Sequence, residues 1–168
     1  FDIAPPLVAP SLDPQLAHAT FSFVLSTIAS DGLALRATEP TSGAQLVVDR
    51  AITASLALIG PGEITVRGSI TNAIVADHGT TTIDRTTVIG TVHTSILEAS
   101  ESIFTGDVTV VDRFHGCIRF SRVETGSVLP ARHRIVEGVA PRFTSLDRND
   151  AAYARLAETC DVRIRFGA

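Results

Sequence analysis

Short alternations of apolar and polar residues recur along positions 44–106 of this 168-residue chain. One apolar residue anchors each copy, and these anchors are separated by 18, 18 and 15 positions: Ile52, Ile70, Val88 and Ile103. A fixed period near twenty without helical periodicity predicts a solenoid, in which each coil buries its apolar side chains against the next. We therefore predict an all-β fold, namely a right-handed parallel β-helix of roughly five coils.

The alternation also predicts which side chains fill the interior and where the chain bends. We expect the core to contain the anchors and their strand neighbours: Ile52, Ile64, Val66, Ile70, Ile83, Val88 and Ile103. Glycines tolerate unusual backbone angles and are expected at the corners: Gly62, Gly68, Gly79, Gly90 and Gly106. The many serines and threonines are expected to stack in rows that bond to each other or to water.

Three segments are expected along the chain. Residues 1–19 contain four prolines, which disfavour both helix and central strand, so they form an extended lead-in or a short cap. Residues 20–123 form the parallel β-helix. Residues 124–168 form a C-terminal arm and cap packed on the solenoid, with one short capping helix that begins at Asn149 and a last strand over 162–166. This arm would cover the open end, whose terminal strands otherwise leave unpaired backbone groups.

Composition narrows the classes of function and partner. The first 112 residues hold four arginines and twelve acids, whereas the rest hold ten arginines and six acids, and the net charge is −4. A net acidic chain argues against nucleic acid as a partner. No apolar run approaches the ~20 residues that span a bilayer, so no membrane partner is expected. Cys117 and Cys160 lack zinc spacing, and we expect two free, largely buried thiols that pack the cap onto the last coil in a bacterial cytoplasm.

Four stretches of the sequence resemble one bacterial protein family: 97–106 (LEASESIFTG), 116–121 (GCIRFS), 141–145 (PRFTS) and 164–168 (IRFGA). The family consists of right-handed β-helix proteins associated with phage-tail-like (contractile-injection-like) gene clusters. Its pattern carries Tyr where Arg122 stands and a further Cys where Ile135 stands. Members continue past this ending, so we expect the chain, which begins at Phe1 and has no Met, to be part of a longer one. The resemblance implies a structural or partner-binding role and brings no catalytic residues.

Carboxylates are the first candidates for catalysis, because hydrolysis of a glycosidic bond needs two carboxyl groups typically ~5–10 Å apart. Asp49, Asp84 and Glu98 follow strand residues in successive repeats, but Arg67 takes that place between the first two. Alternating charges favour surface pairing across coils, which contributes under about 1 kcal/mol per pair. A carbohydrate-active enzyme stays an alternative function, and a carbohydrate an alternative partner.

Histidine and cysteine residues offer two further candidate sites. His78 and His93 are about one coil apart, and Asp77 precedes His78, so these three side chains would share one face. Turn chemistry also explains the corner at Asp77 and His78. In an extended strand His115 and Cys117 lie on the same face, where an imidazole could activate a thiolate. A cysteine between apolar strand residues is more often a buried small hydrophobe. No histidines have metal-binding spacing, so we predict no metal site and no cofactor.

Arginines gather in the C-terminal arm, where a basic cluster would meet an acidic partner surface or is simply solvated: Arg132, Arg134, Arg142 and Arg148. Three functional hypotheses follow. The first is a non-catalytic structural or protein-interaction module, such as a component of a phage-tail-like particle. The second is a carbohydrate-active or small-molecule enzyme with its site on one β-helix face. The third is a solenoid fragment that associates with itself.

Overall fold

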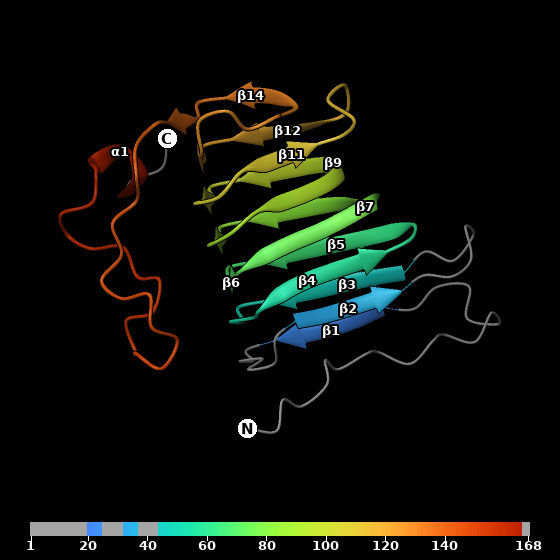
Figure 1. Ribbon diagram of the computed structural model, residues 1–168, viewed down its shortest axis with the longest axis horizontal. Coiled ribbons are helices and arrows are strands. Elements are labelled where there is room, and N and C mark those ends of the chain that lie inside the picture. Colours follow the sequence, from blue (N-terminus) through green and yellow to red (C-terminus); the bar gives the residue numbers. More distant parts are fainter. Residues whose placement is uncertain (1–19, 25–31, 37–43, 166–168) are drawn as a thin grey trace.

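A computed structural model describes residues 20–24, 32–36 and 44–165. In this part of the chain nearly all regular structure is parallel β-strand, and the strands stack as successive coils of one solenoid (Figure 1). The predicted right-handed parallel β-helix is confirmed. The longest path through stacked strands is β1-β3-β5-β7-β9-β12-β14, which corresponds to about six turns where the repeats predicted about five.

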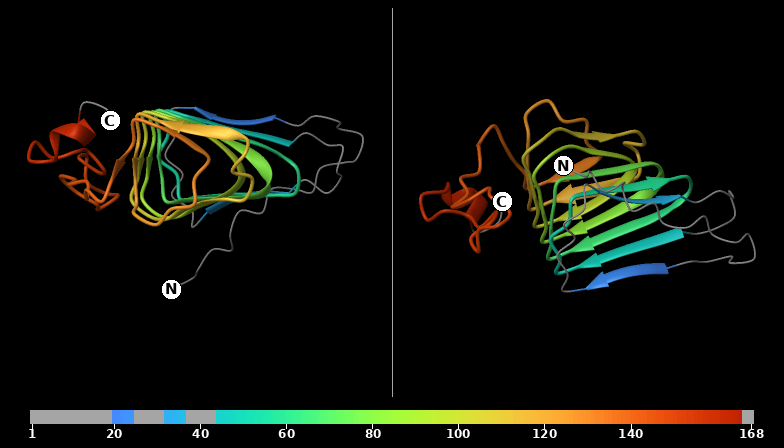
Figure 2. Two further views of the ribbon diagram at one scale, coloured as in Figure 1. Left: turned by 90° about the horizontal axis from the view of Figure 1, so that it is seen from above. Right: turned by 60° about the horizontal axis from the view of Figure 1, so that its bottom comes forward.

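Three strand faces enclose the interior, as the view along the stack shows (Figure 2). The first face contains β1 (Thr20–Val24), β3 (Ala44–Asp49), β5 (Gly62–Arg67), β12 (Gly116–Arg119) and β14 (Ala131–His133). The second contains β2 (Gly32–Arg36), β4 (Ser55–Ile59) and β11 (Val108–Val110). The third contains β6 (Ile70–Thr71), β8 (Thr87–Val88), β10 (Ile103–Phe104), β13 (Arg122–Val123) and β15 (Val136–Glu137). Two long strands, β7 (Ala73–Asp84) and β9 (Val92–Ser100), bend around a corner and belong to the first two faces.

The pairing register gives the length of each coil. Stacked partners on the outer side of the first face are separated by 18, 17, 16, 19 and 14 residues along the chain: Asp49, Arg67, Asp84, Ser100, Arg119 and His133. The 19-residue coil contains the loop 111–115 between β11 and β12. The coils therefore differ in length, and the spacing is not the constant 18 of the first anchors.

Side chains that point inward form one continuous apolar core through the stacked coils. The largest fully buried ones are Phe104, Leu46, Leu56, Leu58, Ile64, Ile74, Ile83, Leu97, Ile118, Val48, Val66 and Val88. Four of the predicted core residues are therefore confirmed, namely Ile64, Val66, Ile83 and Val88. They lie on faces where the alternation of apolar and polar residues matches the pleat of the strand.

The predicted core positions of the other three anchors are wrong by one residue. Ile52, Ile70 and Ile103 are half-buried, and the residues that follow them are the buried ones: Thr53, Thr71 and Phe104. Strands of the third face are only two residues long and follow a corner, so an alternation cannot be carried into them from the first face. Ile103 packs instead against the C-terminal arm.

A left-handed corner precedes the third face in successive coils. The non-glycine residues that occupy it have positive φ angles: Arg50 (49°), Arg85 (46°), Glu101 (49°), Phe120 (48°) and Arg134 (48°). Gly68 occupies the equivalent position in one coil, with φ of 53°. This conformation costs a non-glycine residue about 1–2 kcal/mol, so the corner needs bonds that hold it.

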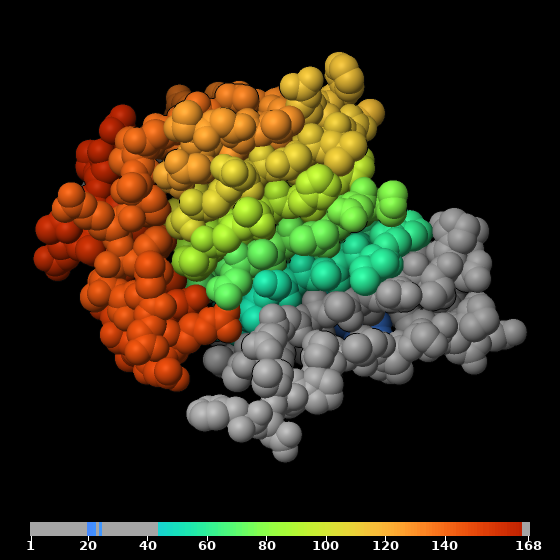
Figure 3. All heavy atoms as spheres, in the orientation of Figure 1, coloured from blue at the N-terminus to red at the C-terminus, as the bar shows by residue number. Residues whose placement is uncertain are grey.

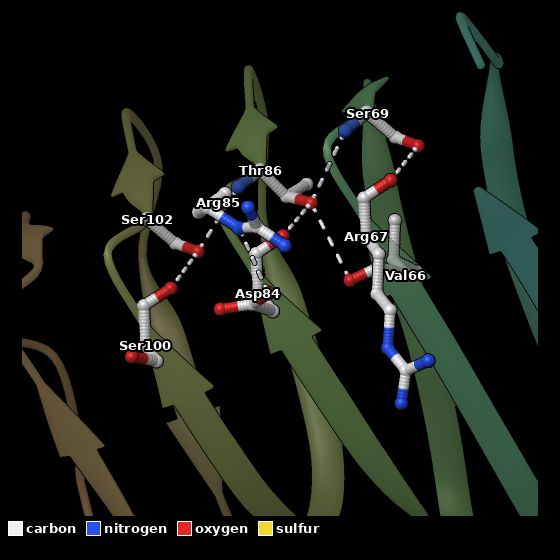
Figure 4. Close-up of polar contacts among 8 residues, drawn as sticks. All are labelled: Val66, Arg67, Ser69, Asp84, Arg85, Thr86, Ser100 and Ser102. Carbon is white, nitrogen blue, oxygen red and sulfur yellow. Dashed lines mark hydrogen bonds and ion pairs between the residues drawn. The ribbon is translucent and has the colours of Figure 1, made fainter. Parts of the chain in front are cut away.

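A row of hydroxyl groups supplies those bonds, and we call Ser69, Thr86, Ser102 and Ser121 the hydroxyl ladder. Figure 4 shows its first three members. The backbone N–H of Ser69 donates to Thr86 Oγ1 at 3.4 Å, and that of Thr86 donates to Ser102 Oγ at 3.1 Å. Each hydroxyl donates in turn to the carbonyl two residues earlier, as Ser102 does to Ser100 at 2.6 Å. The predicted serine and threonine rows are thus present, but they bond mainly to backbone.

The C-terminal arm runs back along the flank of the solenoid, where it forms a ridge beside the coils (Figures 1 and 3). It reaches the early coils, because Arg148 Nη2 donates to the carbonyl of Thr53 at 3.1 Å. It then returns to β10, where Cys160 and Ile164 lie in one apolar cluster with Ile103. The expectation that the arm covers the open end is wrong for the described residues, since β14 remains the last strand of its sheet.

The predicted secondary structure within the arm is also wrong. Residues 148–154 form turns and isolated bridges where a helix was expected, and the Asp150 carboxylate accepts the N–H of Ala152 at 2.8 Å. The segment expected to be a strand contains helix α1 (Val162–Arg165) instead. There Asp161 Oδ1 accepts the N–H of Arg163 at 2.9 Å. Such side-chain bonds to nearby backbone groups favour turns and helix starts over longer regular elements.

Candidate functional site

One corner of the solenoid brings together the acid and one histidine of a predicted site. Three residues of β7, Asp77 to Gly79, oppose the single residue Ser95 between β7 and β9 register partners, so this corner bulges outward. Asp77 Oδ1 lies 3.5 Å from His93 Nε2, and both side chains are substantially exposed, at 61% and 45%. No hydrogen bond or ion pair joins His78 to them in the described chain. Within the same residues, no group of three or more His, Cys, Asp or Glu side chains could hold a metal.

Among the described residues, no hydrogen bond joins His115 and Cys117, the second predicted pair. His115 Nδ1 lies 2.7 Å from Asp112 Oδ2 in the loop before β12. Cys117 is half-buried on the outer side of β12, whereas Cys160 is buried in the arm, in the cluster that contains Ile103 and Ile164. The prediction that both thiols join the cap to the last coil is therefore wrong for Cys117, although both are free.

The loop 111–115 carries the most exposed large apolar side chain of the described residues. Phe114 is 95% exposed and Val111 is 63% exposed. Val128, on the next coil beside β11, is also exposed. The lengthened 19-residue coil and the Asp-x-Phe sequence were the signals in the chain that could have located this loop, but the sequence interpretation treated Phe114 only as a neighbour of the His–Cys pair.

Asp112 holds this loop in one shape. Its Oδ1 accepts the backbone N–H of Phe114 at 3.0 Å, while its Oδ2 contacts the imidazole of His115. The hydrogen bond from His115, followed by that from the Phe114 backbone, holds the pKa of the Asp112 carboxyl below its usual value. The carboxylate is therefore the favoured form, and it fixes the loop between β11 and β12 (Figure 1), which carries the exposed side chains of Val111 and Phe114.

Two of the four predicted partner-binding arginines lie on the last coil. Arg132 Nη1 donates to Glu137 Oε1 at 2.9 Å. The guanidinium carbon of Arg134 lies 5.8 Å from the ring centroid of Phe120, within the range of a cation–π contact. Each of these arginines therefore already has a partner on the last two coils.

The other two predicted arginines are placed elsewhere. Arg148 binds the carbonyl of Thr53 in the early coils, so its role in the structure is to hold the arm. Arg142 contributes its backbone N–H to the sulfur of Cys160 at 3.4 Å. The four arginines are therefore not one cluster: Arg132 and Arg134 lie on the last coil, whereas Arg148 contacts the early coils.

The charged row on the first face lines a shallow groove of about 390 Å³ that includes Arg67, Asp84, Glu98 and Arg119. Asp84 is engaged there by Arg85 Nε at 3.0 Å. In the described residues, the carboxyl groups with a clearly shifted pKa are all shifted downward, chiefly by hydrogen-bond donors: Asp112, Glu124, Asp150 and Asp161. A glycosidase general acid needs the opposite shift.

Arg122 is a buried cation to which the sequence interpretation gave no role. It is 3% exposed, and its Nη2 donates to Glu124 Oε2 at 2.6 Å. Its Nε donates to the carbonyl of Val139 at 2.7 Å, and its Nη1 to the carbonyl of Phe104. The hydrogen bond from Arg122, and then its charge, lower the pKa of Glu124. This guanidinium therefore joins the coil to the start of the arm.

In comparisons with known proteins, no family model, curated protein or solved structure matches the chain. Nothing in them links it to phage-tail-like gene clusters. Among the described residues, no helix is long and apolar enough to cross a membrane. The fold and the geometry of its surface are thus the observations on which a function must rest.

Proposed function

We propose that this chain is a non-catalytic structural module that docks another protein, with the loop 111–115 as its principal contact. The observation that carries the proposal is the 95% exposure of Phe114 beside the 63% exposure of Val111. Burial of a phenylalanine side chain contributes about 1.5–3 kcal/mol, and aromatic side chains dominate the binding energy of many protein interfaces. A partner that buries the Phe114 side chain therefore gains more binding free energy than a partner that docks on the flat strand faces.

The shape of the loop supports the same function. The two bonds of the Asp112 carboxylate to the Phe114 backbone and to His115 order the loop before any partner arrives. Strands β11 and β12, which flank it, are hydrogen-bonded to β9. A contact that is already ordered loses less conformational entropy on binding.

Two alternatives are less well supported. The carbohydrate-active enzyme gains no support from the carboxyl groups whose pKa is clearly shifted, because in the described residues these shifts are all downward. Self-association by strand addition would use β14, which is three residues long and whose residues are all exposed. It carries Arg132 and His133, and a short, charged edge strand opposes such pairing.

The resemblance of residues 97–168 to β-helix proteins of phage-tail-like gene clusters supplies the setting of the proposal. The partner would then be another component of a tail-like particle. Free thiols at Cys117 and Cys160 favour assembly in the reducing bacterial cytoplasm.

A photo-crosslinking residue placed at position 114 tests the proposal in extracts of the source cells, with the same residue at Leu146 as the control. Leu146 is 59% exposed on the arm, so it reports nonspecific capture. The protein crosslinked from position 114 is then purified and its affinity for the chain is measured by calorimetry. We expect Phe114→Ala to weaken that affinity by ~10-fold or more, which corresponds to ~1.4 kcal/mol, and Leu146→Ala to leave it unchanged.

The thermal midpoint of both variants should equal that of the wild type, because neither side chain is buried. If the Phe114→Ala variant and the wild type bind the crosslinked protein with equal affinity, the loop 111–115 is not the principal contact. Turnover of a polysaccharide by the purified chain, lost on substitution of Asp84 or Glu98 in the groove, would replace the proposal with the enzyme alternative.

A further inference from the structure

A cavity of about 400 Å³ lies between the third face of the solenoid and the returning arm. We call it the flank cavity, and its lining residues are Arg85, Thr86, Thr87, Glu101, Ser102, Ile103, Arg122, Leu156, Arg163, Ile164 and Arg165. Its volume falls in the range of small-molecule sites, which is about 300–1,000 Å³. Because the walls come from coils and arm separated by up to 80 positions in the chain, the cavity exists only when the arm is docked.

The polar lining of the flank cavity is dominated by guanidinium groups. Four arginines and one carboxylate, Glu101, contribute to it. The guanidinium nitrogens of Arg122 already donate to two carbonyls and to Glu124. Arg85 and Arg163 are available, because their side chains are 67% and 60% exposed while remaining attached to a neighbouring carboxylate.

Those neighbouring carboxylates position the two available arginines. Arg85 Nε donates to Asp84 at 3.0 Å. Arg163 donates through Nε and Nη2 to the two oxygens of Asp161, at 3.1 and 2.9 Å. A guanidinium has five N–H donors, so each keeps donors for a ligand. Such a planar fork matches the oxygens of a carboxylate or phosphate group.

The remaining lining is partly apolar: we call Ile103, Leu156 and Ile164 the apolar floor, whereas Thr86, Thr87 and Ser102 are polar. Ile103 and Leu156 are half-buried and pack against the cluster that contains Ile164, which is 7% exposed. The Arg122 bonds to Phe104 on one wall and to Val139 of the arm fix the walls relative to each other. The cavity is thus preformed, with an apolar floor and positive groups on two sides.

We propose that the flank cavity binds a small organic anion that carries a carboxylate or phosphate group on an apolar body. Arg85 from the solenoid and Arg163 from α1 hold the anionic group, while Ile103 and Leu156 contact the body. This site is independent of the loop 111–115, so either function can fail without the other.

Binding of phenyl phosphate and of inorganic phosphate, measured by calorimetry, tests the proposal. Phenyl phosphate should bind at the tighter affinity, because the apolar floor adds to the anionic contact. Arg85→Gln and Arg163→Gln should each weaken the affinity for phenyl phosphate by ~10-fold, as expected for loss of a charge-assisted hydrogen bond. Phe114→Ala should leave the affinity unchanged.

Arg50→Gln is the matched control for Arg85→Gln. Arg50 has the same corner conformation, with φ of 49° against 46°, and it pairs with Asp49 at 3.1 Å, but it does not line the cavity. We expect its variant to bind phenyl phosphate as the wild type does, with the same circular dichroism spectrum as Arg85→Gln. Equal weakening by both variants would show a general charge effect and overturn the site.

Three other results would also overturn the proposal. Equal affinity for phenyl phosphate and inorganic phosphate would mean that the apolar floor is not used. Tighter binding of a glutamate-rich peptide than of phenyl phosphate, lost in Arg85→Gln, would assign the cavity to a protein partner. Absence of binding by the folded wild-type chain would remove the site altogether.

Discussion

Replacement of Ser102 by alanine tests the hydroxyl ladder most directly. Ser102 is 1% exposed, and its Oγ accepts the N–H of Thr86 at 3.1 Å while donating to the carbonyl of Ser100 at 2.6 Å. Alanine fits the same space but leaves the N–H of Thr86, itself in a buried residue, without this partner. A buried donor left unsatisfied costs about 1–3 kcal/mol, and we expect a loss near 2 kcal/mol.

For a chain of this size, 1 kcal/mol shifts the thermal midpoint by about 2–4 °C, so Ser102→Ala should lower it by about 4–8 °C. The midpoint is followed by far-ultraviolet circular dichroism. Ser102→Thr should retain most of the stability, because Thr86 shows that threonine fits the ladder. Ser100→Ala is the control, since it removes a half-buried outward hydroxyl and keeps the carbonyl. Equal midpoints for Ser102→Ala and Ser100→Ala would refute the reasoning.

Three further outcomes are expected. Gly116→Ala should lower the free energy of unfolding, measured in urea, by at least ~3 kcal/mol, because at φ of 90° the new Cβ would lie 2.2 Å from the carbonyl oxygen of Leu97. Gly126 has a similar φ of 93° but open space around it, so Gly126→Ala should cost only ~1–2 kcal/mol, and equal losses would contradict the clash. A maleimide should label half-buried Cys117 in the native chain and Cys160 only after unfolding; the reverse order would contradict their placement. The urea midpoint should fall as the pH drops below 4.5, because the pKa of Glu124 is lower in the folded chain than in the unfolded chain, so the stability that its ion pair contributes is present above the unfolded pKa and is lost as the pH falls through the folded pKa. Glu124→Gln should flatten that decline, and an unchanged slope would contradict the role of the ion pair.

The solenoid could be predicted because its signal is local and repeated. Each coil contains an alternation on the first face, so Ile64, Val66 and Ile83 were placed in the core from the sequence. The third face offered two residues per coil, too few to define an alternation. There Ile70 and Ile103 were assigned inward although they point outward, and an aspartate at Ile70 is accordingly less damaging than one at its buried neighbour.

The candidate sites were harder to predict because they depend on coil length. Coils of 14 to 19 residues change which side chains become neighbours, so His93 meets Asp77 while His78 does not join them. The arm has no repeat at all, and its path is set by single contacts such as Arg148 with Thr53, 95 residues apart. No pattern within the arm encodes such a distant partner.

Arg122 explains how an arm without a repeat becomes part of the fold. It stacks beside Ile103 on the third face, where its long side chain reaches both its own coil and Val139. A tyrosine at this position would have one hydroxyl and could donate to one acceptor, whereas the arginine satisfies three. A buried cation is stable only with a counter-ion, and Glu124 is the counter-ion of Arg122. The docking of the arm, and with it the flank cavity, therefore depends on this pair of charges rather than on apolar contact alone.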